Sequence, residues 1–196
     1  MIINILMNIG LYFGSFNPIH VGHLIIVNHV LNFTSLNKVW IVISPQNPFK
    51  TSSGLLNEYD RLHLVRLAVE EDNRIKASDV EFYLPKPSYT INTLTYLHEK
   101  YPEHTFYIVM GSDSYANLSK WKNYEVILKN YPIYVYNRPG FEIIDKLPGQ
   151  LIVLDAPLLQ ISATEIREFL KAGKSIRYLV PEKVREEIEQ NRYYKK

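Results

Sequence analysis

Short apolar runs rich in β-branched residues alternate along the chain with longer segments of helical periodicity. The runs span residues 9–13, 38–43, 75–78, 105–110, 133–136 and 151–154, and the predicted helices span 24–33, 57–71, a segment opening at 88–90, 121–129, 162–172 and 181–190. This alternation is typical of a parallel sheet with right-handed crossover helices. We therefore expect an α/β fold, a Rossmann-like doubly wound parallel sheet of about five to six strands with flanking helices.

Length and composition limit what such a chain can be. The 196 residues suit one domain, residues 1–196 with a core of about 7–190, and a second methionine, Met7, is a candidate start directly before the first run. The absence of cysteine excludes disulfide scaffolds and thiolate metal sites. A net charge of +2 is too small to argue for a nucleic-acid or membrane partner, and no run reaches the length of a membrane span. We expect a cytoplasmic protein with neither partner.

The first informative motif joins the first run to the first helix. Residues 14–23 read Gly-Ser-Phe-Asn-Pro-Ile-His-Val-Gly-His, so His20 and His23 lie three apart in the first helical turn. A helix N-terminus offers unpaired N–H donors and a partial positive charge, which suit a phosphate. A metal pair is the alternative, but no third ligand is spaced to complete it. Gly22 costs about 1 kcal/mol relative to Ala in a helix, which favours a close approach of backbone to a ligand. We predict a nucleotide-phosphate site.

The second motif, Ile-Ser-Ala-Thr-Glu-Ile-Arg at residues 161–167, opens a later helix. Much of it needs no ligand, because Ser162 with Glu165 forms a capping box and the flanking isoleucines, Ile161 among them, form a hydrophobic staple. Thr164 and Arg167 are left unexplained. A cation near the positive end of a helix is unfavourable unless an anion lies between them. Arg167 therefore indicates a bound anion.

Three other residues have adequate structural explanations when taken alone. Lys50 reads as an ordinary loop lysine, and Asp113 in Gly-Ser-Asp-Ser reads as the cap of a short helix. Trp121 is as compatible with the core as with a platform on which a planar ring stacks.

Taken together, the two motifs resemble those of the nucleotidyltransferase superfamily marked by a Gly-x-Phe-x-Pro-x-His-x-Gly-His loop and an Ile-Ser-x-Thr-x-x-Arg helix start. Within it the chain is most similar to the bacterial nicotinate mononucleotide adenylyltransferases, through residues 88–94, 111–114, 121–122 and 138–140. The similarity runs from Met7 to the last helix. It implies transfer of AMP from ATP, accompanied by Mg²⁺, to nicotinate mononucleotide, which yields nicotinate adenine dinucleotide and pyrophosphate in NAD biosynthesis.

The resemblance also implies roles for individual residues. His20, His23 and Arg167 would act on the phosphates and the transition state. The other residues around ATP would be Gly14, Ser15, Phe16, Gly22, Gly111, Asp113, Ile161, Ser162 and Thr164. Those around the mononucleotide would be Lys50, Ser88, Tyr89, Thr90, Trp121 and Arg138, with Trp121 stacked on the pyridine, backbone N–H groups near Tyr89 and Thr90 on its carboxylate, and Lys50 and Arg138 near its phosphate. No metal site built by the protein itself is implied.

Two departures from the family pattern stand out, and several alternatives stay open. Asn17 replaces a frequent Asp, which we expect to matter little in a turn, and Phe49 replaces the usual His before Lys50. The acceptor could instead be nicotinamide mononucleotide, phosphopantetheine or another small phosphorylated molecule. A cytidylyltransferase and a non-catalytic nucleotide-binding module are further alternatives. The oligomeric state is open, a homo-oligomer included.

Overall fold

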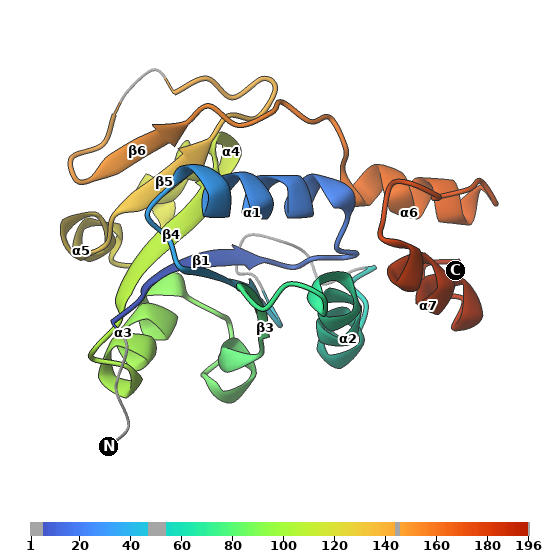
Figure 1. The fold of residues 1–196 in the computed structure, drawn as a ribbon, viewed down its shortest axis with the longest axis horizontal. Helices are drawn as coiled ribbons and strands as arrows, with labels where there is room; N and C mark the ends of the chain where they lie inside the picture. Colours follow the sequence, from blue (N-terminus) through green and yellow to red (C-terminus); the bar gives the residue numbers. More distant parts are fainter. Residues whose placement is uncertain (1–5, 47–53, 144–145, 196) are drawn as a thin grey trace.

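The computed structural model describes residues 6–46, 54–143 and 146–195, and its six strands form one parallel sheet. All six predicted runs are strands, and the sheet order is β3-β2-β1-β4-β5-β6 (Figure 1). Every neighbouring pair is parallel. The strands are β1 (Asn8–Gly14), β2 (Lys38–Ile43), β3 (Ile75–Ser78), β4 (Thr105–Gly111), β5 (Ile133–Tyr136) and β6 (Leu151–Leu154).

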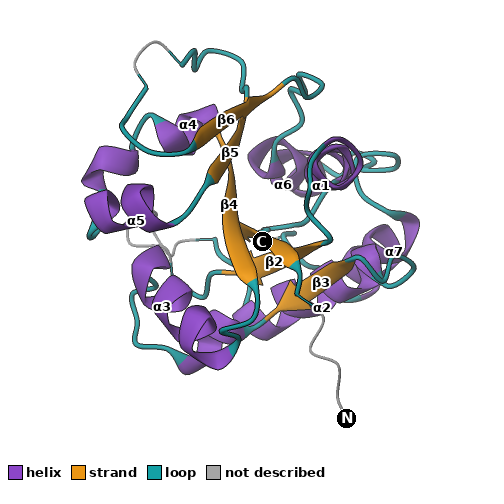
Figure 2. Ribbon diagram, turned by 60° about the vertical axis from the view of Figure 1, so that its left-hand side comes forward, coloured by secondary structure: helices purple, strands orange, loops and turns teal. Residues whose placement is uncertain are grey.

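Helices cover both faces of this sheet (Figure 2), which confirms the doubly wound α/β prediction. The α-helices are α1 (Val21–Phe33), α2 (Glu58–Val69), α3 (Thr90–Lys100), α4 (Ser112–Tyr115), α5 (Tyr124–Asn130), α6 (Ala163–Lys171) and α7 (Glu182–Gln190), and the 3₁₀ turns are η1 (Val80–Tyr83) and η2 (Leu118–Lys120). In the described part of the chain, no helix has the length and apolar character needed to cross a membrane.

The apolar strand sequences are explained by burial on both sides. In β2, Val39, Ile41 and Ile43 pack into the cluster beneath α1, α2, α6 and α7. Trp40 and Val42, the residues between them, belong to the opposite cluster beneath α3 and α5. Because successive side chains of a strand point to opposite faces, a strand covered on both sides must be apolar throughout.

The segment after β4 differs from the prediction of one helix over 121–129. It forms α4 and η2 first, and α5 begins only at Tyr124. Asn123 has a left-handed backbone, with φ of 53°, which separates η2 from α5. Trp121 consequently lies in the connection between two helical segments, where its ring is half-buried.

Sheet order determines where a ligand can bind. The chain runs outward from β1 to β2 and β3 on one side, and from β4 to β5 and β6 on the other. The crevice between the carboxyl ends of β1 and β4 is therefore a topological switch point, the usual ligand site in such sheets. The loops that follow β1, β2 and β4 open there.

A buried arginine from α2 holds the loops after β1 and β2 together. Arg61 is fully buried, and its guanidinium donates to the carbonyl oxygens of Ser15 at 2.6 Å, Ser44 at 2.9 Å and Leu56 at 2.8 Å, with Pro45 farther away at 3.4 Å. Burial lowers the pKa of Arg61, yet an arginine stays charged in proteins. One cation thus fastens the loops after β1 and β2 to the start of α2.

We predict that Arg61→Met destabilises the fold by at least about 3 kcal/mol, because several buried carbonyl oxygens lose their donor. Chemical denaturation measures the loss. Arg66→Met is the matched control, since Arg66 lies on the same helix with a side chain that is 60% exposed. Equal denaturation midpoints for the two variants would contradict the role given to Arg61.

Candidate active site

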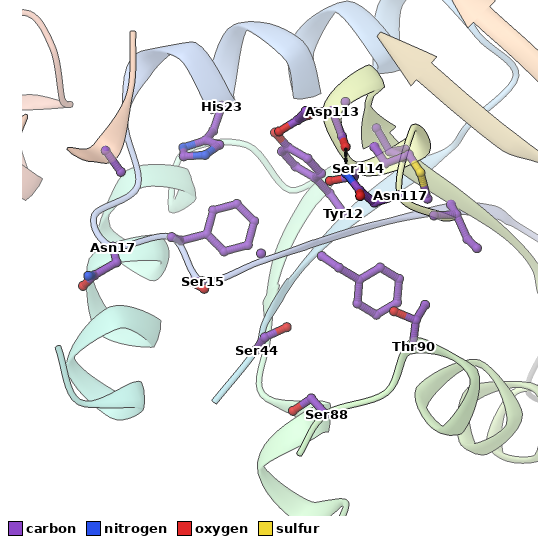
Figure 3. Close-up of a pocket in the computed structure, with 18 of the residues that line it drawn as sticks. Tyr12, Ser15, Asn17, His23, Ser44, Ser88, Thr90, Asp113, Ser114 and Asn117 are labelled. Atoms are coloured by element: carbon purple, nitrogen blue, oxygen red, sulfur yellow. Dashed lines mark hydrogen bonds between the residues drawn. The ribbon is translucent and has the colours of Figure 1, made fainter. Parts of the chain in front are cut away.

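A pocket of about 990 Å³ lies at the switch point and collects most of the predicted site residues. His23, Tyr12 and Asp113 lie on one side of it, and Ser44, Ser88 and Thr90 on the other (Figure 3). The predicted residues that line it are Gly14, Ser15, Phe16, His20, His23, Ser88, Tyr89, Thr90, Gly111, Asp113, Trp121, Arg138, Ser162, Thr164 and Arg167. Gly22 and Ile161 line a smaller adjoining pocket. Lys50 and Phe49 lie outside the described residues.

The two histidines stack at the start of α1. Their ring centroids are 3.7 Å apart with an interplanar angle of 29°. Nδ1 of His23 accepts a hydrogen bond from the backbone N–H of His20 at 3.3 Å. In a neutral His23 ring the proton therefore sits on Nε2.

His20 is held uncharged. It is 3% exposed, and burial, with a smaller contribution from the charge of Arg138, lowers its pKa from 6.5 to about 4. A neutral imidazole beside a second imidazole avoids placing two like charges at stacking distance. His20 thus enters any chemistry near neutral pH as a hydrogen-bonding group rather than as a cation.

Phe16 packs against this pair of histidines, and two glycines leave room for the rings. A Cβ on Gly22 would lie 3.0 Å from Nδ1 of His20, so Gly22 gives room to the histidine ring, and the close approach of a ligand there stays a prediction. Phe16 adopts a left-handed φ of 44°, which turns its ring toward His23 at a centroid distance of 5.0 Å. A Cβ on Gly14 would lie 2.9 Å from the Phe16 ring. The small residues of the motif thus permit ring packing.

A short hydrogen bond joins the two sequence motifs. Nη1 of Arg167 donates to the backbone oxygen of Asn17 at 2.7 Å across a separation of 150 residues, and Nη2 lies 3.2 Å from the Thr164 hydroxyl. Ser162 caps α6 by accepting from the N–H of Glu165, as predicted. Arg167 and Thr164, which capping left unexplained, therefore line the pocket together with the histidines.

Asn17 matters more than we expected from the sequence. Its side-chain amide donates to the carbonyl oxygen of Gly54 at 3.0 Å and accepts from the N–H of Leu56 at 3.1 Å. An ionised aspartate could accept but not donate, so it would lose the first bond. The amide ties the loop after β1 to the segment that leads into α2.

Asp113 and Arg138 lie together on the β4–β5 side of the pocket. Oδ1 of Asp113 is 3.9 Å from Nε of Arg138, and the N-cap of α4 is Gly111. Asp113 is therefore not the helix cap that the sequence suggested. The charge of Arg138 contributes to lowering the pKa of His20, so Arg138 lies near that histidine as well as near Asp113.

The other end of the pocket holds a buried carboxyl that sequence reasoning missed. Glu81 is 2% exposed, accepts from the Thr93 hydroxyl at 2.9 Å, and has its pKa raised by burial. Nothing in the surrounding sequence marks Glu81 as buried.

Arg61, which sequence reasoning also missed, did carry a signal, because it precedes Val65 and Val69 at intervals of four on the apolar side of its helix.

The donor set does not build a metal cage. Among residues 6–46, 54–143 and 146–195, no group of three or more histidine, aspartate or glutamate side chains could hold a metal ion. A divalent cation that kept its waters and bound through phosphate oxygens would need no such group.

We predict that acid destabilises the fold partly through His20. The unfolded chain binds a proton at His20 near pH 6.5, whereas the folded chain binds it only near pH 4, so stability is lost as the pH falls between these values. The loss amounts to about 3 kcal/mol. In His20→Gln the difference in unfolding free energy between pH 7 and pH 4 shrinks by up to this amount. An unchanged difference in denaturation experiments would refute the assignment.

Comparisons with known proteins agree with this geometry. Residues 11–169 match the model of the cytidylyltransferase-like family. A relative from Flavobacterium johnsoniae, "Probable nicotinate-nucleotide adenylyltransferase", is 52% identical and covers 97% of this chain and 100% of its own. A relative of the same name from Cytophaga hutchinsonii is 51% identical and covers 96% and 98%.

A solved structure shares the fold. Plasmodium falciparum nicotinic acid mononucleotide adenylyltransferase complexed with NaAD superposes with a TM-score of 0.82 at 23% identity, over 96% of this chain and 97% of its own. At that identity the structure supports the fold, while the curated relatives and the family model support the family. The chain therefore belongs to the nicotinate-nucleotide adenylyltransferase family of cytidylyltransferase-like proteins.

Proposed function

We propose that this protein transfers the adenylyl group of ATP to the phosphate of nicotinate mononucleotide in NAD biosynthesis. An oxygen of the mononucleotide phosphate bonds to the α-phosphorus of ATP. The bond from that phosphorus to the oxygen bridging the α- and β-phosphates breaks, and pyrophosphate leaves with the electron pair. The acceptor phosphate is already anionic at neutral pH, so the reaction needs no general base.

The hydrogen bond between Arg167 and Asn17 is the observation that best supports this proposal. It places an arginine, a threonine hydroxyl and two stacked imidazoles around one end of the pocket. Two mutually repelling anions must be held in line there, and charge developing on the leaving pyrophosphate must be stabilised. Donors that are already in position do this without reorganising during the reaction.

Each group has a distinct part in the proposed site. Nε2–H of His23 and the neutral ring of His20 donate to the α-phosphoryl oxygens, and Arg167 with Thr164 holds the β- and γ-phosphates. Asp113, on the β4–β5 side, accepts from ribose hydroxyls of the adenosine. Mg²⁺ would enter on the ATP phosphates and neutralise part of their charge. Arg138 remains a candidate for the mononucleotide phosphate, and its position near His20 would also bring it close to the reacting phosphates.

The far end of the pocket suits the pyridine half of the acceptor. Trp121 is half-buried there and lines the pocket, so one face can stack on a planar ring. α3 begins at Thr90 with no side-chain cap, so its first N–H groups have no partner from a capping side chain. N–H donors favour a carboxylate over an amide, because the amide presents donors of its own.

We also place this reaction in the cytoplasm.

We predict that the wild-type protein with ATP and Mg²⁺ has a kcat/KM for nicotinate mononucleotide at least tenfold above that for nicotinamide mononucleotide or phosphopantetheine. The acid meets the uncapped N–H groups with two acceptor oxygens, whereas the amide presents an NH₂ donor beside its one carbonyl oxygen. Pyrophosphate release measures each rate, and CTP in place of ATP tests the nucleotide. A rate with nicotinate mononucleotide no higher than with the other acceptors would overturn the proposal.

We predict that His20→Ala and His23→Ala each lower kcat at least tenfold, because each removes a donor to the transition state. Pyrophosphate release gives kcat, and circular dichroism checks that the variants fold. His98→Ala is the control, since His98 is exposed on α3 and does not line the pocket. If both variants retain kcat within twofold of wild type, the histidines have no part in the mechanism.

A further inference from the structure

Lys122 lines the pocket at the end that we propose for the pyridine. Nζ of Lys122 lies 4.8 Å from the centroid of the Tyr89 ring, and both residues line the pocket. Tyr89 directly precedes α3, whereas Lys122 follows Trp121 in the connection to α5. The electrostatic attraction of an ammonium for the ring face restricts where this flexible side chain lies. It connects the two segments that would enclose the pyridine.

The charge of Lys122 has no carboxylate partner in the part of the chain that the structure describes. Among the described residues, no carboxylate lies within ion-pair distance of its Nζ, and its recorded interaction is with the Tyr89 ring. Of the two carboxyl groups that line the pocket, Asp113 pairs with Arg138, whereas Glu81 is buried, accepts from Thr93 through one oxygen only, and has its pKa raised by burial. An anionic ligand group at this end would therefore meet a cation without a competing carboxylate partner.

The neighbouring lysine, Lys120, is held by a different segment of the chain. Nζ of Lys120 donates to Oδ1 of Asn117 at 2.8 Å, and the Asn117 amide donates to the backbone oxygen of Asp113 at 3.0 Å. Lys120 lines the same pocket but is tied to the α4 segment. The structure thus separates two lysines of equal charge, one beside Tyr89 and one beside Asn117.

We propose that Lys122 is a specificity-determining residue, which selects an acceptor bearing a pyridine carboxylate over one bearing a carboxamide. This inference rests on the proposed function. Backbone N–H groups alone discriminate through hydrogen bonding, but a cation adds an attraction that a neutral amide cannot match. Because Lys122 is exposed, solvent and salt screen that attraction, and the preference it adds is moderate and falls with ionic strength.

The test compares kcat/KM for nicotinate and nicotinamide mononucleotides in wild type, Lys122→Gln and Lys122→Arg. We expect Lys122→Gln to lower the acid-to-amide ratio about tenfold through a higher KM for the acid, with kcat and the KM for ATP little changed. Lys122→Arg retains the charge and should keep the ratio within about threefold. The wild-type ratio should also fall as salt rises, and this salt dependence should disappear in Lys122→Gln.

Lys120→Gln is the matched control, because it removes the same charge from the same pocket and should leave the acid-to-amide ratio unchanged. A ratio in Lys122→Gln within twofold of wild type, or an equal fall in Lys120→Gln, overturns the inference while wild-type turnover of nicotinate mononucleotide upholds the proposed function. Absence of that wild-type turnover overturns both. Binding of nicotinate adenine dinucleotide and of NAD, measured by calorimetry, gives the same comparison without catalysis.

Discussion

A buried cation organises the site before any substrate arrives. The guanidinium of Arg61 donates to backbone oxygens of the loops after β1 and β2 and of the segment entering α2. Loops at strand ends have few partners of their own, and a charged donor satisfies several buried carbonyl oxygens at once. Arg61 therefore holds the loop that leads to His20 and His23 in place, although Arg61 itself does not line the pocket.

The phosphate end of the pocket depends on that support. Asn17 lies within the loop that Arg61 holds, and its backbone oxygen accepts from Arg167 of α6. The side chains proposed to bind the phosphates thus come from opposite ends of the chain, and a short hydrogen bond from Arg167 to the backbone oxygen of Asn17 joins their segments. His20 remains neutral because it is buried, so the site offers hydrogen-bond donors beside its arginines without accumulating repelling imidazolium charges.

The end of the pocket that we propose for the pyridine has a different task, since it discriminates between acceptors and does not react. It combines a stacking surface, an uncapped helix terminus and the ammonium of Lys122 over Tyr89. These groups come from the connections after β3 and β4, beside α3 and α5, which cover the opposite face of the sheet from α6. One crevice in the sheet can therefore bind two anionic nucleotides with separate sets of residues.

The sequence by itself determined the strands, the doubly wound class and the two phosphate motifs, because hydrophobic period and capping chemistry are local properties. Only the tertiary structure decided that Gly22 makes room for a ring, that the Asn17 amide is needed as a donor, and that Asp113 pairs with Arg138 instead of capping a helix. Each of these depends on contacts between segments far apart in the chain or on the exact course of a turn. Local patterns do not encode such contacts, which arise when the sheet brings the ends of its strands together.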